Sequence, residues 1–303
     1  MNASHIRDEF REQSAGWARM GSPLMARLAN LFAARLDDST QTGQRMLNWT
    51  PNPEDALLLR LTGGLHRLIL EGRAPVLAAA YSDPDSSDDA LWSAVDSIMR
   101  HRDGELLQSL DSAPQTNEVR RSSILIAVAH LLTDRFKLPL VISELGSSAG
   151  LNLLFDHYCL DINGTKFGPE NAALTLRPDW QGPLPPQTVP QIVAREGVDL
   201  NPLDPKADAL RLLSYIWADQ TERLARTQTA LDLAAEQSPQ VTQGDAVDWL
   251  EQRLTMHLPG RLHVIWHTVF WQYLSPEARA RATALLDAAG GKATDDAPLA
   301  HFA

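Results

Sequence analysis

The sequence has a single cysteine, Cys159, among its 303 residues. One thiol excludes an internal disulfide framework and a structural zinc site built from several cysteines. Uninterrupted apolar stretches of about 18 residues are also missing, so no transmembrane helix is predicted. Residues 1–10 lack the apolar segment of a secretory signal peptide. We therefore expect a cytoplasmic protein that has no membrane partner.

Runs of basic residues are absent as well. Lys and Arg total 27 while Asp and Glu total 38, which gives a formal net charge of −11. Nucleic-acid binding needs a basic surface to neutralise phosphates, so we expect no nucleic-acid partner. Hydrophobic residues make up 44% and charged residues 21%, which is typical of a soluble globular protein. The length leaves room for two domains.

Residues 5 to about 135 show the spacing of amphipathic helices and no convincing strand. Apolar side chains recur at helical intervals, at Phe10, Trp17, Leu24 and Leu28 and again at Leu57, Leu61, Leu65 and Leu68. Ser22-Pro23 and Asn52-Pro53 have the pattern of helix starts, an N-cap residue followed by proline. We predict an all-helical N-terminal domain over residues 1–136. We expect it to act as a cap that closes over the second domain and excludes water.

After Lys137, short apolar segments alternate with helical ones. Strands are predicted at 140–144, 191–199, 240–245, 261–267 and, beginning the last, 298–302, and helices at 150–157, 210–236, 246–254 and 275–289. Such alternation predicts an α/β domain, Rossmann-like, with a mostly parallel sheet over residues 137–303. Glu144, Asp199, Asp245 and His267 fall at carboxyl ends of these strands, where such sheets bind ligands.

An insertion is predicted at about 156–190. Residues 158–162 and 165–167 flank Asn163-Gly164, the dipeptide that favours a tight type I′ hairpin turn. The segment Pro178 to Pro190 is rich in proline and reads as a loop.

The segment Glu144-Leu-Gly146-Ser-Ser148-Ala-Gly150 is the most informative motif. It places an acid at the end of a buried strand and then a glycine-rich turn, where backbone N–H groups are available to a ligand. Together with Gly197-Val-Asp199 and Gly244-Asp245-Ala246, it resembles class I S-adenosylmethionine-dependent methyltransferases over residues 138–290. That superfamily normally adds two strands after the fifth, so by this resemblance the C-terminal strands are abbreviated or cut off.

The resemblance implies a cofactor, S-adenosylmethionine, and methyl transfer to an unidentified small molecule. Glu144, Gly146, Ser148 and Gly150 would hold the methionine end, Asp199 the ribose, and Asp245 with Ala246 the adenine. This interpretation requires the carboxylates to line one rim and the hollow above Gly146 to be free of protein side chains. No metal ion is needed.

Two further sets of residues are candidates for substrate binding and catalysis. Gln115, Asn117, Glu118, Arg120 and Arg121 form a dense polar set that is suited to an acidic or amide-bearing substrate. The same residues also fit a simple helix cap, with Thr116 or Asn117 as the N-cap. His267 is a candidate general base at neutral pH, or a hydrogen-bonded histidine without chemistry.

Two alternatives stay open. Gly146-Ser-Ser148-Ala-Gly150 is also a literal Gly-x-Ser-x-Gly, the nucleophile elbow of α/β-hydrolases, with Ser148 as nucleophile, Asp199 or Asp245 as acid and His267 as base. The second alternative is a non-catalytic protein that binds a nucleoside cofactor. The whole chain also resembles an uncharacterised bacterial family, through residues 115–121, 144–153, 197–204 and 217–223.

Overall fold

The computed structural model describes residues 2–50, 52 and 55–303 and divides the chain into two compact units. The helical unit comprises Met1–Thr116 and Leu210–Ala225, and the sheet unit comprises Asn117–Ala209 and Arg226–Ala303. The chain therefore leaves the sheet unit once and returns to it. The predicted boundary at 136/137 differs from this division, which falls at 116/117.

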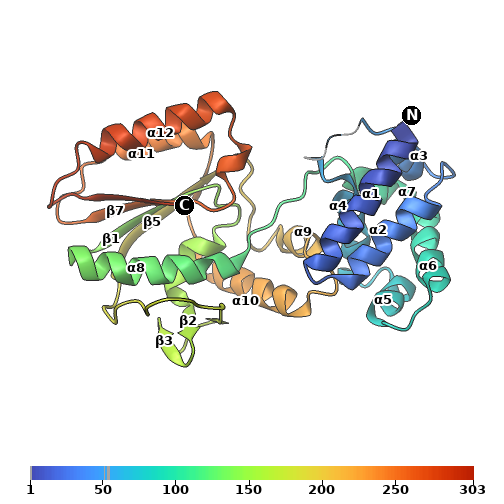
Figure 1. Cartoon of the computed structure of the whole chain (residues 1–303), viewed down its shortest axis with the longest axis horizontal. Helices are drawn as coiled ribbons and strands as arrows, with labels where there is room; N and C mark the ends of the chain where they lie inside the picture. The colour runs from blue at the N-terminus through green and yellow to red at the C-terminus, as the bar shows by residue number, and fades with distance from the viewer. Residues whose placement is uncertain (1, 51, 53–54) are drawn as a thin grey trace. The chain divides into compact units, whose positions relative to one another are not determined.

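Helices build the whole helical unit (Figure 1). They are α1 (Asn2–Arg19), α2 (Pro23–Arg35), α3 (Gln41–Leu47), α4 (Leu57–Leu70), α5 (Pro75–Ser82), α6 (Asp88–His101) and α7 (Asp103–Ser109), with most of α9 (Ala209–Ser214) and the start of α10 (Thr221–Gln237). The predicted apolar positions form their common core; Phe10, Leu28 and Leu61 are fully buried. Ser22 caps α2 by accepting from the Met25 N–H, and Pro23 follows it as predicted. Pro53 of the second predicted start lies outside the described residues.

The predicted single helix over 210–236 is wrong, because two helices occupy this range. Residues 215–220 leave helical geometry between α9 and α10 and turn at Trp217, whose carbonyl accepts from the Gln220 N–H at 2.9 Å. Tyr215 and Ile216 are buried, 6% and 2% exposed. Their packing inside the helical unit outweighs the helical periodicity of the local sequence.

Five parallel strands form the central sheet of the sheet unit, in the order β6-β5-β1-β7-β8. They are β6 (Val241–Gln243), β5 (Ile192–Asp199), β1 (Leu140–Leu145), β7 (Leu262–Trp266) and β8 (Leu299–Phe302). Counted along the chain, this order is third, second, first, fourth, fifth, which matches the doubly wound Rossmann order over these strands. The predicted Rossmann-like parallel sheet is confirmed at this level. Its switch point lies between β1 and β7.

Helices cover both faces of the sheet (Figure 1). On one face lie α11 (Ala246–Leu254) and α12 (Pro276–Gly290), whose Val247, Leu250 and Leu286 pack on Val198 and Ile265 of the strands. On the other lies α8 (Ser122–Phe136), which the domain prediction had assigned to the helical cap. Because α8 buries its apolar face in this unit, its residues belong with the sheet.

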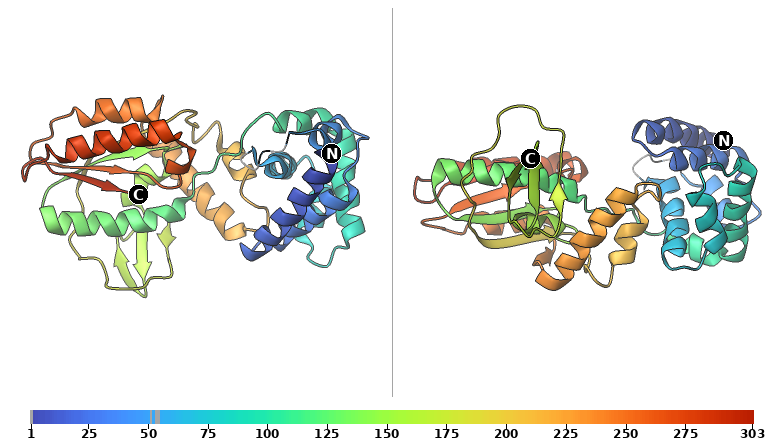
Figure 2. Two further views of the ribbon diagram at one scale, coloured as in Figure 1. Left: turned by 45° about the horizontal axis from the view of Figure 1, so that its top comes forward. Right: turned by 90° about the horizontal axis from the view of Figure 1, so that it is seen from below.

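The insertion forms a second, small sheet on the α8 side (Figure 2). Its strands β2 (Cys159–Ile162), β3 (Thr165–Phe167) and β4 (Thr175–Leu176) lie in the order β3-β2-β4. Asn163 and Gly164 have φ values of 52° and 91°, the left-handed pair that a type I′ turn requires. The predicted hairpin is confirmed. Short 3₁₀ helices complete the unit: η2 (Val119–Arg121), η3 (Leu151–His157) and η4 (Trp271–Tyr273).

Within the described residues, none of the helices combines the length and the apolar character needed to cross a bilayer.

A glycine in β5 sets how closely the turn after β1 approaches the sheet. A Cβ at Gly197 would lie 1.9 Å from the Ser147 Oγ. We expect Gly197→Ala to destabilise the protein by about 1–3 kcal/mol, the usual cost of overpacking. Urea unfolding measures the change. Gly290→Ala is the matched control, because a Cβ there meets nothing within 4 Å at the end of α12. Equal stability of the two variants would contradict this account.

Candidate functional site

The turn after β1 wraps over the carboxyl end of β5. Gly146, Ser148 and Gly150 all have left-handed backbones, with φ values of 73°, 54° and 71°. The N–H groups of Gly146 and Ser147 both donate to the Val198 carbonyl, at 2.9 and 3.1 Å. Glycine adopts this conformation freely, whereas a serine there needs support from its surroundings.

Asp199 supplies that support. Its Oδ2 accepts from the Ser148 N–H at 2.8 Å, and its Oδ1 accepts from the Asn201 N–H at 2.9 Å. The acid at the end of the second strand is thus joined to the turn after the first. Each carboxylate oxygen has a second lone pair, so these two bonds leave acceptor capacity for a ligand.

Asp245 caps a helix. Its Oδ1 accepts from the N–H groups of Val247 and Asp248 at 2.8 and 3.0 Å, which makes it the N-cap of α11. The side chain is exposed and Ala246 is buried beneath it. Helix capping therefore explains the Gly-Asp-Ala motif locally. The contact of Asp245 and Ala246 with adenine stays a prediction.

Glu144 is a buried carboxyl group, 3% exposed, at the end of β1. Burial raises its pKa well above the usual value, and the nearby Ser147 hydroxyl and Arg121 guanidinium offset only part of that shift. Its Oε2 has no hydrogen-bond partner among the described residues. The same is true of the buried Nε1 of Trp266, which lies directly across from Glu144 on β7. Paired strand neighbours share a face of the sheet, so two side chains with an unsatisfied polar atom lie on one face at the switch point, and these atoms do not bond each other.

Two residues of the polar set at 115–121, Asn117 and Arg121, contact the two sides of this switch point, whereas Gln115 belongs to the helical unit. Asn117 is buried, and its Oδ1 accepts from the Leu151 N–H at 3.0 Å, just after the glycine-rich turn. Arg121 donates to the carbonyl and hydroxyl of Thr268, both at 3.3 Å, just after β7. The set therefore ties the ends of β1 and β7 together.

The alternative interpretation of these residues as a helix N-cap holds in part. The N-cap of η2 is Glu118 rather than Thr116 or Asn117, since the Glu118 carboxylate accepts from the Arg120 N–H at 3.0 Å. Glu118 also pairs with Arg226 of α10 at 3.4 Å. Arg120 itself is exposed. Substrate binding by these side chains stays a prediction.

His267 is buried directly after β7. Its ring stacks on Trp271 with centroids 4.8 Å apart, and its Nε2 lies 3.2 Å from the Nε2 of His301 on β8. Burial, and then the neighbouring His301, lower the pKa of His267 to about 4. The imidazole is therefore neutral at pH 7 but is a weak base. The sequence analysis did not identify His301; its only signal was a polar residue at the end of the last predicted strand.

Side chains fill the space beside the two outer glycines of the turn. A Cβ at Gly146 would lie 2.7 Å from the Phe270 ring, and one at Gly150 would lie 3.0 Å from Pro239. The free hollow above Gly146 that the cofactor interpretation requires is thus not present in this conformation. Val269, directly before Phe270, has φ of 52°, a strained value for a β-branched residue.

The contacts of the sheet histidines give no support to the hydrolase alternative. The Nε2 of His263 lies 2.9 Å from the Ser143 Oγ, and that of His267 meets His301. Asp199 bonds the backbone of Ser148 and not a histidine ring. Among the described residues, no cluster of three or more His, Cys, Asp or Glu side chains is arranged to hold a metal ion.

The pairing of His267 makes a prediction about pH. Its pKa falls from about 6.5 when unfolded to about 4 when folded, so the unfolded chain binds more protons between these values. The stability it contributes is complete above pH 6.5 and is lost as the pH falls towards 4, on the order of 3 kcal/mol at most. We expect His267→Gln to flatten the pH dependence of urea unfolding in this window. The control is His257→Gln, at an exposed histidine, which should keep the wild-type slope. A wild-type slope in His267→Gln would refute the assignment.

Comparison with known proteins identifies the family. No curated protein and no solved structure gives a significant match to the chain. One family profile matches residues 7–303, nearly the whole length. The chain belongs to that family, DUF2332, described as an uncharacterized protein conserved in bacteria.

Proposed function

We propose that the carboxyl edge of the central sheet binds S-adenosylmethionine and that the protein transfers its methyl group to a small molecule. One observation carries the proposal: the acid that ends β5 bonds the glycine-rich turn that follows β1, through Asp199 Oδ2 and the Ser148 N–H. This hydrogen bond lies at the edge of a parallel sheet with the Rossmann strand order. Sheets of this type bind ligands at the carboxyl ends of their strands.

The donor and acceptor groups at this edge fit such a cofactor. The spare lone pairs of Asp199 suit the two hydroxyls of a ribose. The unsatisfied Oε2 of Glu144 suits an ammonium group, which would also favour the ionised carboxylate in spite of its burial. Gly146 and Gly150 have no Cβ of their own on the backbone on which the cofactor would lie.

Space is the remaining requirement, and it depends on Phe270. The ring lies against Gly146, so a cofactor on the turn requires Phe270 to turn away. The strained backbone of Val269 lowers the cost of that movement, because leaving the left-handed conformation releases strain of about 1–3 kcal/mol. We infer that residues 268–271 take a second conformation when the cofactor is bound.

The cofactor supplies a methyl group activated by a positively charged sulfur. The protein then has to bind, orient and exclude water, because alignment provides most of the rate enhancement in such a transfer. Arg121, whose guanidinium bonds Thr268, contributes a positive charge beside the switch point that suits an acidic acceptor. His267, neutral at pH 7, is able to accept a proton from an acceptor that loses one, although its lowered pKa limits the driving force.

Removing the Asp199 carboxylate tests the proposal. We expect Asp199→Ala to weaken binding of S-adenosylhomocysteine by about one to two decades, because one or two charge-assisted hydrogen bonds are lost. Titration calorimetry measures the affinity. Glu236→Ala, at an exposed acid of α10, is the control and should bind like wild type. Asp199→Asn keeps the side chain's shape should the alanine variant unfold. Unchanged affinity in both Asp199 variants, or no binding by wild type, would remove the site.

Phe270 should oppose binding. We expect Phe270→Ala to bind S-adenosylhomocysteine more tightly than wild type, by severalfold, because no ring has to be displaced from Gly146. The matched control is Tyr273→Ala, which removes an aromatic ring that is 76% exposed nearby. Calorimetry on the two variants gives the comparison. Weaker binding in Phe270→Ala, with Tyr273→Ala unaffected, would show that the ring contacts the ligand and does not exclude it.

A further inference from the structure

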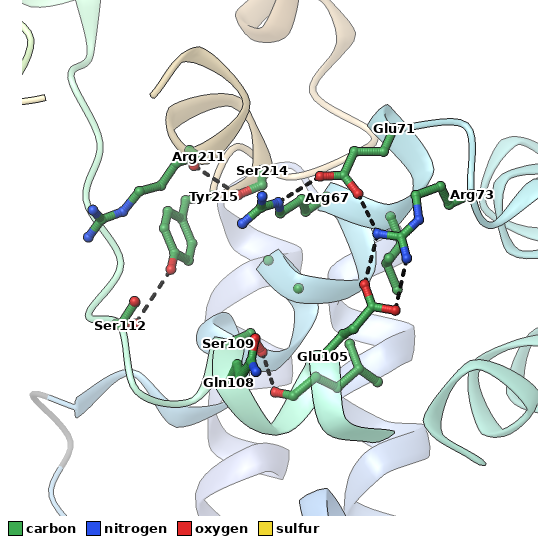
Figure 3. Close-up of a pocket in the computed structure, with 14 residues that line it drawn as sticks. Arg67, Glu71, Arg73, Glu105, Gln108, Ser109, Ser112, Arg211, Ser214 and Tyr215 are labelled. Atoms are coloured by element: carbon green, nitrogen blue, oxygen red, sulfur yellow. Dashed lines mark hydrogen bonds and ion pairs between the residues drawn. The ribbon is translucent and has the colours of Figure 1, made fainter. Parts of the chain in front are cut away.

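The helical unit contains a cavity of its own, with a volume of about 330 Å³ (Figure 3). Its walls come from three helices that are far apart in the chain: α4, α7 and α9. All the lining residues belong to the helical unit. The volume is within the range of small-molecule sites, about 300–1,000 Å³.

Two adjacent glycines of α4 form one wall. A Cβ at Gly63 would lie 2.7 Å from the Tyr215 ring, and one at Gly64 would lie 2.7 Å from the Ser109 Oγ. Each glycine inside a helix costs about 1 kcal/mol relative to alanine. The pair is nevertheless required, since it lets Tyr215 and Ser109 reach the helix backbone and so sets the shape of the cavity.

The charge on the cavity wall is unbalanced. Three arginines line it, Arg67, Arg73 and Arg211, against two glutamates, Glu71 and Glu105. Arg73 is neutralised twice, by Glu71 at 3.0 Å and by Glu105 at 2.8 Å. One positive charge remains in excess, in a chain whose net charge is −11.

Arg67 and Arg211 lie on either side of the Tyr215 ring in Figure 3, and because Arg67 is ion-paired with Glu71, the excess charge is that of Arg211. Arg67 bonds Glu71 through its Nε at 2.8 Å, and no other described group bonds its guanidinium. The Nε of Arg211 is buried and has no hydrogen-bond partner among the described residues. Guanidinium groups with open donor edges bind carboxylate and phosphate in a bidentate manner.

The serine hydroxyl groups of the cavity wall act as hydrogen-bond acceptors, in contrast to the arginines, which are donors. Ser109 donates to the Leu106 carbonyl at 2.6 Å, and Ser214 donates to the Arg211 carbonyl at 2.8 Å. Because each hydroxyl already donates its proton to a backbone carbonyl, it is able only to accept a hydrogen bond from a ligand. Donors for an anion and acceptors for hydroxyl groups therefore line one cavity.

We propose that this cavity binds a small hydroxylated anion, with its charged group at Arg67 and Arg211 and its hydroxyls at Ser109 and Ser214. The charged group is a carboxylate or a phosphate, since both match the guanidinium fork. The site is separate from the proposed cofactor site, which lies in the sheet unit.

Calorimetry on the full chain with three probes tests the proposal: glucose 6-phosphate, gluconate and uncharged glucose. We expect binding of at least one of the two anions and not of glucose. A response to the phosphate ester alone, or to the carboxylate alone, identifies the charged group. Equal binding of glucose and the anions, or binding of none of them, overturns the proposal.

Variants then locate the bound anion. Arg211→Gln and Arg67→Gln should each weaken its binding about tenfold or more, through loss of a charge-assisted bond. Arg19→Gln is the control, because it removes the same charge from an exposed position of α1 that does not line the cavity. Asp199→Ala should also bind the anion like wild type. Equal affinity in wild type and both cavity variants would place the anion elsewhere and refute the site.

Discussion

The carboxyl edge of the central sheet depends on the carboxylate of Asp199. Both of its oxygens accept backbone N–H groups, one from the turn after β1 and one from its own turn after β5. It thereby supports a serine in the left-handed region at Ser148, which would be disfavoured without such a bond. Under the proposed function the same carboxylate both shapes the turn and binds the ribose.

Close approaches explain why a glycine motif is ambiguous. At Gly197 the neighbour is Ser147, at Gly146 it is Phe270, and at Gly150 it is Pro239. In each case glycine makes room for a side chain of the protein itself. A cofactor needs the same absence of a Cβ, so the spacing of glycines predicts a close approach without saying what approaches.

Much of the sheet unit was predictable because its signals are local. Apolar segments that end at Glu144, Asp199 and His267 marked strands, and Asn163-Gly164 marked a turn, since both depend on neighbouring residues in the chain. The predictions that failed concern features set by packing between residues far apart in the sequence. The break after α9 exists because Tyr215 and Ile216 are buried in the helical unit, and the periodicity of residues 210–236 contains no trace of that.

The residues of the candidate site show the same contrast between local sequence signals and long-range packing. Strand-end acids were found from the sequence, and the bond of one of them, Asp199, to the Ser148 N–H is a property of the register between β1 and β5. The contact of Phe270 with Gly146 and the presence of His301 at the edge were not predicted, because each reaches the edge along a path that the sequence does not specify. Side chains that close a site are set by loop geometry, whereas side chains that open from strand ends are set by the sheet.

The carboxyl edge of the sheet carries an energetic cost. Glu144 Oε2 and Trp266 Nε1 are each buried without a partner among the described residues, and each such group costs about 1–3 kcal/mol. Val269 adds backbone strain a few residues further on. Under the proposed function, a ligand that donates to Glu144 would remove part of this cost, and the conformation with Phe270 against Gly146 would be the ligand-free one.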